Sequence, residues 1–152
     1  MDWVTSAGVG PFFITEYGEG MLQDTVYRNQ ASPLAMITAL TQVGDMQLEL
    51  IQPIGDLPNV FRDTVPEGHS AYHHIGIWSR DLESDFDRYR RQGFEVVGSG
   101  RTNADGRFGF VDTHIVLGHM TELLEYSEAL EERFQMIAEA AREWNGKDPI
   151  RG

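Results

Sequence analysis

The sequence contains an internal repeat, which constrains the fold more than any other feature. In each half a glycine separates a helical pattern from a strand pattern, at Gly8 and at Gly93. Each half also ends in a strand with a central glutamate, Leu48-Glu49-Leu50 in the first and Thr121-Glu122-Leu123 in the second. Such self-similarity indicates a duplicated supersecondary unit. We therefore predict an α+β fold made of two tandem βαβββ modules.

The second module is the more complete of the two. Residues 72–78 read as a strand, and Asp81 is a suitable N-cap for a helix that ends at Gly93. We then expect strands at 94–97, 107–112 and 120–126. The glycine-rich stretch 98–106 is expected to be a loop or the end of a hairpin.

The first module lacks its beginning. Strands are expected at 11–17, 23–29, 34–42 and 46–53, although 34–42 also fits a helical period. Pro33 and Gly44 bracket that run closely and favour a strand. From His74 to Gly93 there are 19 residues, whereas only seven residues precede Gly8. We therefore expect the first strand and most of the first helix of this module to be missing, with residues 1–7 as the last turn of that helix.

The repeat also predicts the boundaries of the parts. Residues 1–53 form the incomplete first module, 54–71 a linker or loop, and 72–126 the second module. Phe61 is expected to anchor a short helical turn within the linker. Residues 127–152 form a helix and tail, with Ser127 as the N-cap. The expected buried face of this helix consists of Leu130, Phe134, Ile137, Ala138, Ala141 and Trp144.

Composition excludes several functional classes. The 152 residues include 24 acidic and 12 basic ones, a formal charge of −12, which argues against a nucleic-acid partner. The absence of cysteine excludes disulfides, thiolate metal sites and cysteine nucleophiles. No run of about 18 apolar residues exists, and the N-terminus does not resemble a signal peptide. We expect a cytoplasmic protein that does not bind membranes.

Three expected strands each carry one candidate metal ligand: Glu49, His74 and Glu122. Strand alternation places His74 on one face with Gly76 and Trp78. A carboxylate in an apolar strand is costly to bury unless it is paired or coordinated. One imidazole and two carboxylates suit Zn, Ni, Co, Mn or Fe(II). Taken singly, each residue fits an ordinary polar role, but together they predict a divalent metal site.

The other candidate groups carry weaker signals. Alternation places His73 on the face opposite His74, which favours a structural role. A loop or surface position is the simpler interpretation for His69, His114 and His119. Arg101 and Arg107 lie near the glycine-rich stretch, where they are either binders of an anionic group or solubilising surface residues.

Four segments resemble the vicinal oxygen chelate superfamily, which includes glyoxalase I, methylmalonyl-CoA epimerase, extradiol dioxygenases and bleomycin-resistance proteins. They are residues 8–13, 48–53, 73–77 and 121–125. The resemblance implies that the two modules form a U-shaped mixed sheet around a divalent metal, with ligands at Glu49, His74 and Glu122. It also implies a fourth ligand, His or Gln, on the first strand, which is the strand expected to be missing. A small-molecule substrate and a homodimer are expected.

The resemblance implies a metal-dependent lyase, isomerase or epimerase that acts on a small oxygenated substrate through an enolate or enediolate. Glu122 is then the candidate catalytic residue that moves a proton. One alternative is a metal-free binding protein of the bleomycin-resistance type, or an inactive remnant. Another is an extradiol dioxygenase, but that chemistry needs Fe(II) with two histidines and one carboxylate, whereas the candidate set here has one histidine and two glutamates.

Overall fold

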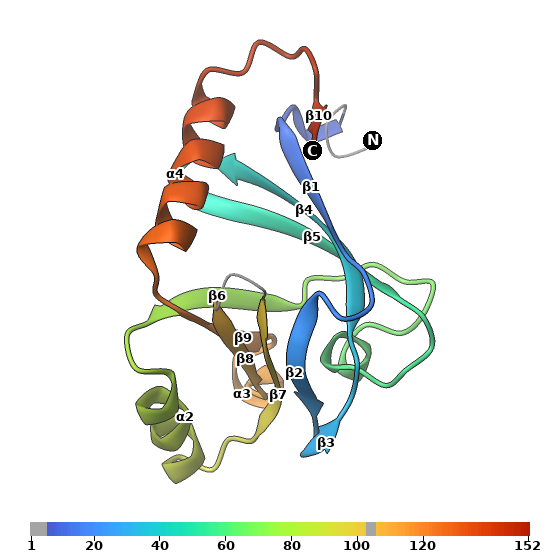
Figure 1. Cartoon of the computed structure of the whole chain (residues 1–152), viewed down its shortest axis with the longest axis vertical. Coiled ribbons are helices and arrows are strands. Elements are labelled where there is room, and N and C mark those ends of the chain that lie inside the picture. The colour runs from blue at the N-terminus through green and yellow to red at the C-terminus, as the bar shows by residue number, and fades with distance from the viewer. Residues whose placement is uncertain (1–5, 103–105) are drawn as a thin grey trace. The chain divides into compact units, whose positions relative to one another are not determined.

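The computed structural model describes residues 6–102 and 106–152 (Figure 1). It is an α+β fold with strands in two mixed sheets and a C-terminal helix, which confirms the predicted class. The chain divides into two compact units. The first unit comprises Met1–Tyr17, Ala35–Ile54 and Ser127–Gly152, and the second comprises Gly18–Leu34 and Gly55–Tyr126. The module boundaries expected from the repeat stay predictions.

The first unit contains a four-stranded sheet with the order β10-β1-β4-β5. β1 (Phe12–Tyr17), β4 (Ala35–Val43) and β5 (Met46–Ile54) are antiparallel neighbours, and β10 (Ile150–Arg151) pairs in parallel with β1. Gly44 has a φ of +59° in the turn between β4 and β5, a conformation that favours glycine. The strand assignment of residues 34–42 is thereby confirmed. Among the described residues, β5 forms the outer edge of this sheet.

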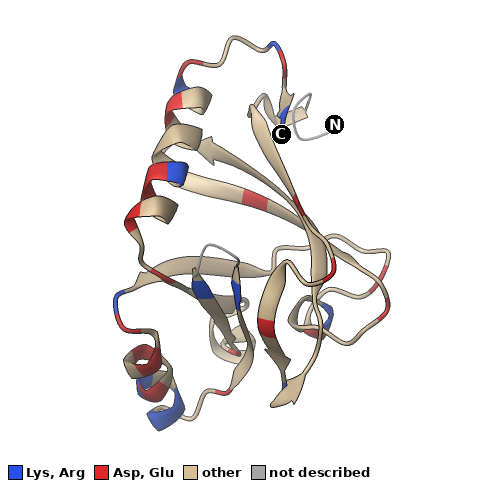
Figure 2. Ribbon diagram, in the orientation of Figure 1, with Lys and Arg blue, Asp and Glu red and all other residues tan. Residues whose placement is uncertain are grey.

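Helix α4 (Glu128–Arg142) packs against β4 in the same unit. Ser127 caps it as predicted, because its hydroxyl accepts a hydrogen bond of 3.2 Å from the Leu130 amide. Ile137 is fully buried. Acidic side chains lie in the first turn and a basic one in the last, which suits the helix dipole (Figure 2). The other residues of the predicted face are half-buried: Leu130, Phe134, Ala138, Ala141 and Trp144.

The second unit contains a six-stranded sheet with the order β3-β2-β7-β8-β9-β6. β6 and β9 are parallel, and the other neighbours are antiparallel. Helix α2 (Leu82–Arg91) covers this sheet, with Leu82 and Phe86 buried against Val111 and Leu123. The strands are β2 (Leu22–Tyr27), β3 (Gln30–Ala31), β6 (His74–Ser79), β7 (Val96–Thr102), β8 (Arg107–Val111) and β9 (Met120–Glu125).

The observed six-stranded sheet differs from two of the sequence-based expectations. The strand expected at 23–29 was counted in the first half of the repeat, but β2 pairs with β7. The stretch 98–106 is not wholly a loop, because β7 extends through it to Thr102. A Cβ on Gly100 would lie 2.9 Å from Phe108 and from Thr25, so glycine here serves close packing inside the sheet. Residues 103–105 lie outside the described residues.

The linker contains the predicted helical turn, the 3-10 helix η1 (Val60–Asp63), with Phe61 buried. The Asn59 side chain caps it by accepting a 3.1 Å hydrogen bond from the Phe61 amide. A short helix, α3 (His114–Leu117), follows β8 and was not expected. Ser6 and Ala7 are helical, whereas the rest of the expected first helix, residues 1–5, lies outside the described residues.

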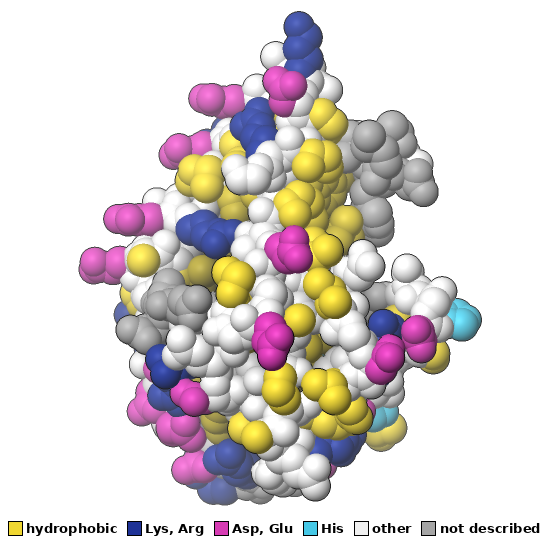
Figure 3. Space-filling model, turned by 45° about the vertical axis from the view of Figure 1, so that its right-hand side comes forward, with side chains coloured by type: hydrophobic (Ala, Val, Ile, Leu, Met, Phe, Trp, Pro, Cys, Tyr) yellow, Lys and Arg dark blue, Asp and Glu magenta, His cyan; other side chains and the backbone are white. Residues whose placement is uncertain are grey.

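The surface carries apolar and charged side chains in close mixture (Figure 3). Acidic side chains are prominent on the face shown, as the net charge of −12 leads one to expect. Over the described residues, no helix is long and apolar enough to cross a membrane.

Candidate metal centre

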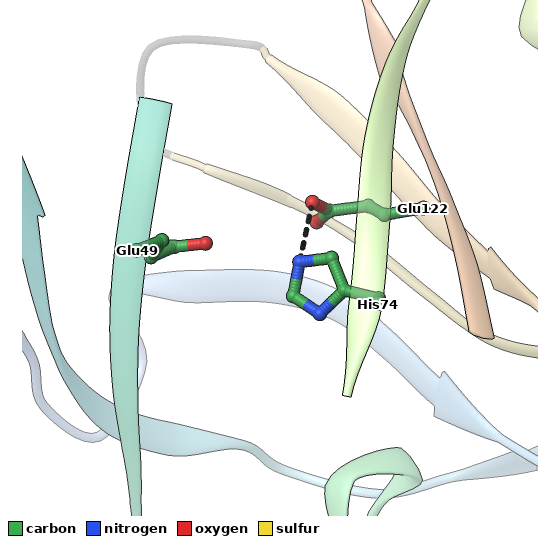
Figure 4. Close-up of side chains that lie close together, drawn as sticks. All are labelled: Glu49, His74 and Glu122. Atoms are coloured by element: carbon green, nitrogen blue, oxygen red, sulfur yellow. Dashed lines mark ion pairs between the residues drawn. The ribbon is translucent and has the colours of Figure 1, made fainter. Parts of the chain in front are cut away.

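The second unit brings two of the three predicted ligands together. His74 and Glu122 lie on the adjacent parallel strands β6 and β9. Nε2 of His74 is 3.3 Å from Oε2 of Glu122, and their side chains are only 11% and 12% exposed (Figure 4). A nearly buried carboxylate therefore faces a nearly buried imidazole.

Gly76 and Phe110 flank this pair on the two neighbouring strands. Gly76 lies opposite Glu122 in the β6–β9 register, and a Cβ at Gly76 would be 3.4 Å from Oε2 of Glu122. On the other side of β9, Phe110 is the register partner of Glu122. The Phe110 ring packs edge-to-face on His74 with 5.3 Å between ring centroids. Phe110 thus gives the His74 ring an apolar neighbour beside the Glu122 carboxylate.

Glu49 lies on β5 of the first unit and is also drawn in Figure 4. It is half-buried and stands opposite Leu40 in the β4–β5 register. Its strand position matches that of Glu122, since each glutamate lies in the strand that closes its half of the repeat. The structure therefore describes Glu49 in one unit, and His74 with Glu122 in the other.

The expectation for His73 is wrong in one respect. Its ring does not point away from His74, because β6 begins only at His74 and strand alternation does not extend back to His73. Nδ1 of His73 lies 2.9 Å from Nδ1 of His74, and Nε2 of His73 lies 3.2 Å from the carbonyl oxygen of Val60. Burial, and secondly the neighbouring His74, lower the pKa of His73 to about 4, so its ring is neutral at pH 7.

Residues 2–110 match the family described as the Glyoxalase/Bleomycin resistance protein/Dioxygenase superfamily. The chain belongs to this superfamily. The resemblance seen in the four short segments is thus confirmed at the level of the superfamily. No curated protein sequence matches the chain significantly.

Several solved structures are similar to this superfamily member. A hypothetical protein from Bacillus halodurans C-125 is 16% identical with a TM-score of 0.49, over 84% of this chain and 83% of that one. A methylmalonyl-CoA epimerase in complex with methylmalonyl-CoA and NH4+ is 18% identical with a TM-score of 0.47, over 83% of each chain. A methylmalonyl-CoA epimerase from Mycobacterium tuberculosis is 18% identical with a TM-score of 0.44, over 86% of this chain and 79% of that one.

The remaining histidines of this superfamily member make local contacts. Nδ1 of His69 donates to the carbonyl oxygen of Glu67 at 3.0 Å. Nδ1 of His119 donates to the carbonyl oxygen of the next residue at 2.7 Å. His114 pairs with Asp112 at 2.5 Å. These contacts do not involve His74 or Glu122, in keeping with the weaker signals assigned to the three histidines.

The two arginines considered for anion binding are engaged with carboxylates. Nε of Arg101 lies 2.7 Å from Oδ2 of Asp24. Arg107 forms an ion pair with Glu83, and its Nη1 lies 3.6 Å from Oε1 of Glu125. An anionic ligand would have to compete with these carboxylates, so anion binding at either arginine stays a prediction.

The donor set of His74 and Glu122 fits a divalent metal ion. An imidazole nitrogen and a carboxylate oxygen are ligands that Zn, Mn, Co, Ni and Fe(II) accept. Two ligands that each lie about 2.1 Å from one ion stand roughly 3 Å apart, close to the separation seen here. Sequence reasoning found these two side chains but missed Phe110 and Val60. An aromatic residue on the strand next to Glu122 was the available signal for Phe110.

Proposed function

We propose that this superfamily member is a metal-dependent isomerase, epimerase or lyase that acts on a small oxygenated substrate through an enolate or enediolate. The observation that carries the proposal is the His74–Glu122 pair, a carboxylate and an imidazole held 3.3 Å apart in largely buried positions. A buried carboxylate next to a histidine is typical of metal and proton-transfer sites.

In this proposal Glu49 joins His74 and Glu122 as the third protein ligand of one divalent ion. The internal repeat supports this set, because it gives Glu49 and Glu122 equivalent strand positions. When bound, such an ion polarises a substrate carbonyl and stabilises the negative charge of an enolate oxygen.

The chain's own residues would then perform the proton transfer. Glu122 takes a proton from the carbon beside the substrate carbonyl and returns it to the same carbon or to its neighbour. His74 holds the Glu122 carboxylate in position. Phe110 packs on the His74 ring and makes the surroundings of the pair less polar, which strengthens electrostatic interactions with a developing enolate charge.

Metal binding by the purified protein tests the proposal. After chelator treatment, titration with Zn²⁺ or Mn²⁺ in a calorimeter is expected to show one ion per chain. His74→Ala and Glu122→Gln should weaken binding by at least about tenfold, and Glu49→Gln should do the same. Glu125→Gln is the matched control, since Glu125 lies on the same strand as Glu122 but on its other face. Failure of the wild type to bind either ion, or binding unchanged in all three variants, would overturn the metal site.

Activity is tested separately by deuterium wash-in. The metal-loaded protein is incubated in D₂O with a panel of 2-hydroxy-carbonyl compounds and acyl thioesters, and exchange at the carbon beside the carbonyl is followed by NMR. We expect exchange that Glu122→Gln abolishes and Glu125→Gln leaves intact. Metal binding without any exchange would argue for a binding protein instead. The expected homodimer stays a prediction, which sedimentation velocity tests.

A further inference from the structure

Two arginines of the first unit have no part in the proposed function. Nη2 of Arg133, on α4, donates a 2.7 Å hydrogen bond to the hydroxyl oxygen of Thr15. Arg151, in β10, holds its guanidinium carbon 5.8 Å from the centre of the Phe13 ring. Phe13 and Thr15 are two residues apart on β1, so their side chains project from the same face of the four-stranded sheet. Both guanidinium groups therefore lie next to each other on that face.

The same face carries Glu49. In the antiparallel register Phe13 stands opposite Leu40, and Leu40 stands opposite Glu49. Residues that stand directly opposite each other share one face of a sheet. Because neighbouring strands are about 4.8 Å apart, the backbone at Phe13 and the backbone at Glu49 are separated by roughly 10 Å. The first unit thus holds two cationic groups and a candidate metal ligand on one sheet face, roughly 10 Å apart.

The charges of Arg133 and Arg151 are not neutralised by carboxylates. In the part of the chain that the structure describes, neither arginine forms an ion pair. Both are half-buried, and Arg133 lies one helical turn before the fully buried Ile137 on α4. With 24 acidic residues in the chain, carboxylate partners are abundant. Several other arginines do form ion pairs with them: Arg28, Arg88, Arg90, Arg101 and Arg107.

These guanidinium groups have donors to offer a ligand. Each carries five N–H groups in a planar fork that matches the oxygens of a carboxylate or a phosphate. Thr15 occupies one donor of Arg133, and the contact of Arg151 with Phe13 is a cation–π contact.

We propose that Arg133 and Arg151 together bind an anionic group of the substrate, a carboxylate or a phosphate. They thereby select substrates that carry this group roughly 10 Å from the reacting end. The assignment to the substrate rests on the proposed function, whereas the anion site itself does not.

Anion binding is tested on the metal-free protein, dialysed free of chelator, with inorganic phosphate at low salt. The Nε–H signals of Arg133 and Arg151 in ¹H–¹⁵N NMR are expected to shift and saturate. Arg133→Gln and Arg151→Gln should each weaken phosphate binding about 10- to 100-fold. Arg142→Gln, at an exposed arginine of the same helix, is the matched control and should bind as the wild type does.

Two results would overturn the anion site. One is a wild type whose Arg133 and Arg151 signals do not respond to phosphate. The other is a loss of affinity in Arg142→Gln as large as in the two test variants, which would indicate a general charge effect. Circular dichroism checks the fold of each variant. Should Arg133→Gln not fold, Arg151→Gln and the wild-type signals still decide.

Substrate selection is tested by deuterium exchange with matched pairs of acyl thioesters. The members of a pair differ only in a terminal phosphate or hydroxyl roughly 10 Å from the carbonyl. The wild type should prefer the phosphate member in kcat/KM, and Arg133→Gln should reduce this preference about 10- to 100-fold, chiefly through KM. Arg142→Gln should keep it. A wild type that exchanges both members equally would overturn the assignment to the substrate. Phosphate binding without metal binding or exchange would refute the proposed function and leave the anion site standing.

Discussion

The strands that carry Glu49 and Glu122 have similar sequences but different neighbours. β9 is flanked by β8 and β6, and its residues Glu122 and Leu123 are 9% and 0% exposed. Among the described residues, β5 has a strand only on one side, and its residues Glu49 and Leu50 are half-buried. The same pattern thus gives a core strand in the second unit and an edge strand in the first. The environment of each glutamate is set by adjacent strands rather than by its own sequence.

Truncation of the leucine that follows each glutamate tests this comparison with the largest expected effect. Leu123→Ala leaves a cavity beside Phe86 and Val111 and should lower the free energy of unfolding by about 3 kcal/mol. Leu50→Ala, at the equivalent position of β5, should cost only about 1 kcal/mol because the side chain is half-buried. Urea unfolding followed by circular dichroism measures both. Equal losses in the two variants would show that β5 is as enclosed as β9.

The packing of helix α2 on the second sheet gives a smaller effect. A Cβ on Gly109 would lie 2.3 Å from the Phe86 ring and 3.1 Å from the carbonyl oxygen of Gly98. Gly109→Ala must therefore displace Phe86, at a cost of about 2 kcal/mol. Gly18→Ala is the control, since no atom lies within 4 Å of its Cβ position. The same urea titration should leave the control near the wild type. A Gly109→Ala protein as stable as the control would mean that α2 is loosely packed.

Local sequence signals predicted most of the elements. Alternation, capping residues and turn glycines placed β1, β4, β5, α2 and α4, and the repeat singled out Glu49 and Glu122. The pairing of β2 with β7 depends on contacts between residues more than 70 positions apart, such as Gln23 with Arg101, which no local pattern specifies.

The candidate site shows the same division between local and tertiary information. His74 and Glu122 were identifiable because each is a polar residue in a strand pattern. The orientation of the His73 ring could not be predicted, because it depends on the exact start of β6 and on a carbonyl contributed by the linker. Likewise, Gly100 was read as a loop residue, although it lies in β7, where Thr25 and Phe108 leave little room for a side chain.

The smallest expected effect compares the N-caps of the two long helices. Asp81 accepts a 3.0 Å hydrogen bond from the Ser84 amide at the start of α2, and Ser127 accepts one of 3.2 Å at the start of α4. Replacement of either by alanine should cost about 1 kcal/mol. Asp81 adds a negative charge at the positive end of the helix dipole, so Asp81→Ala should cost roughly 0.5 kcal/mol more at low salt. Because salt screens that charge, the two losses should converge in about 1 M NaCl. Asp81→Asn keeps the capping hydrogen bond but removes the charge. We expect it to lose only the salt-sensitive part of the stability, roughly 0.5 kcal/mol. A difference between the caps that persists in high salt would mean that Asp81 stabilises α2 through packing or geometry and not through its charge.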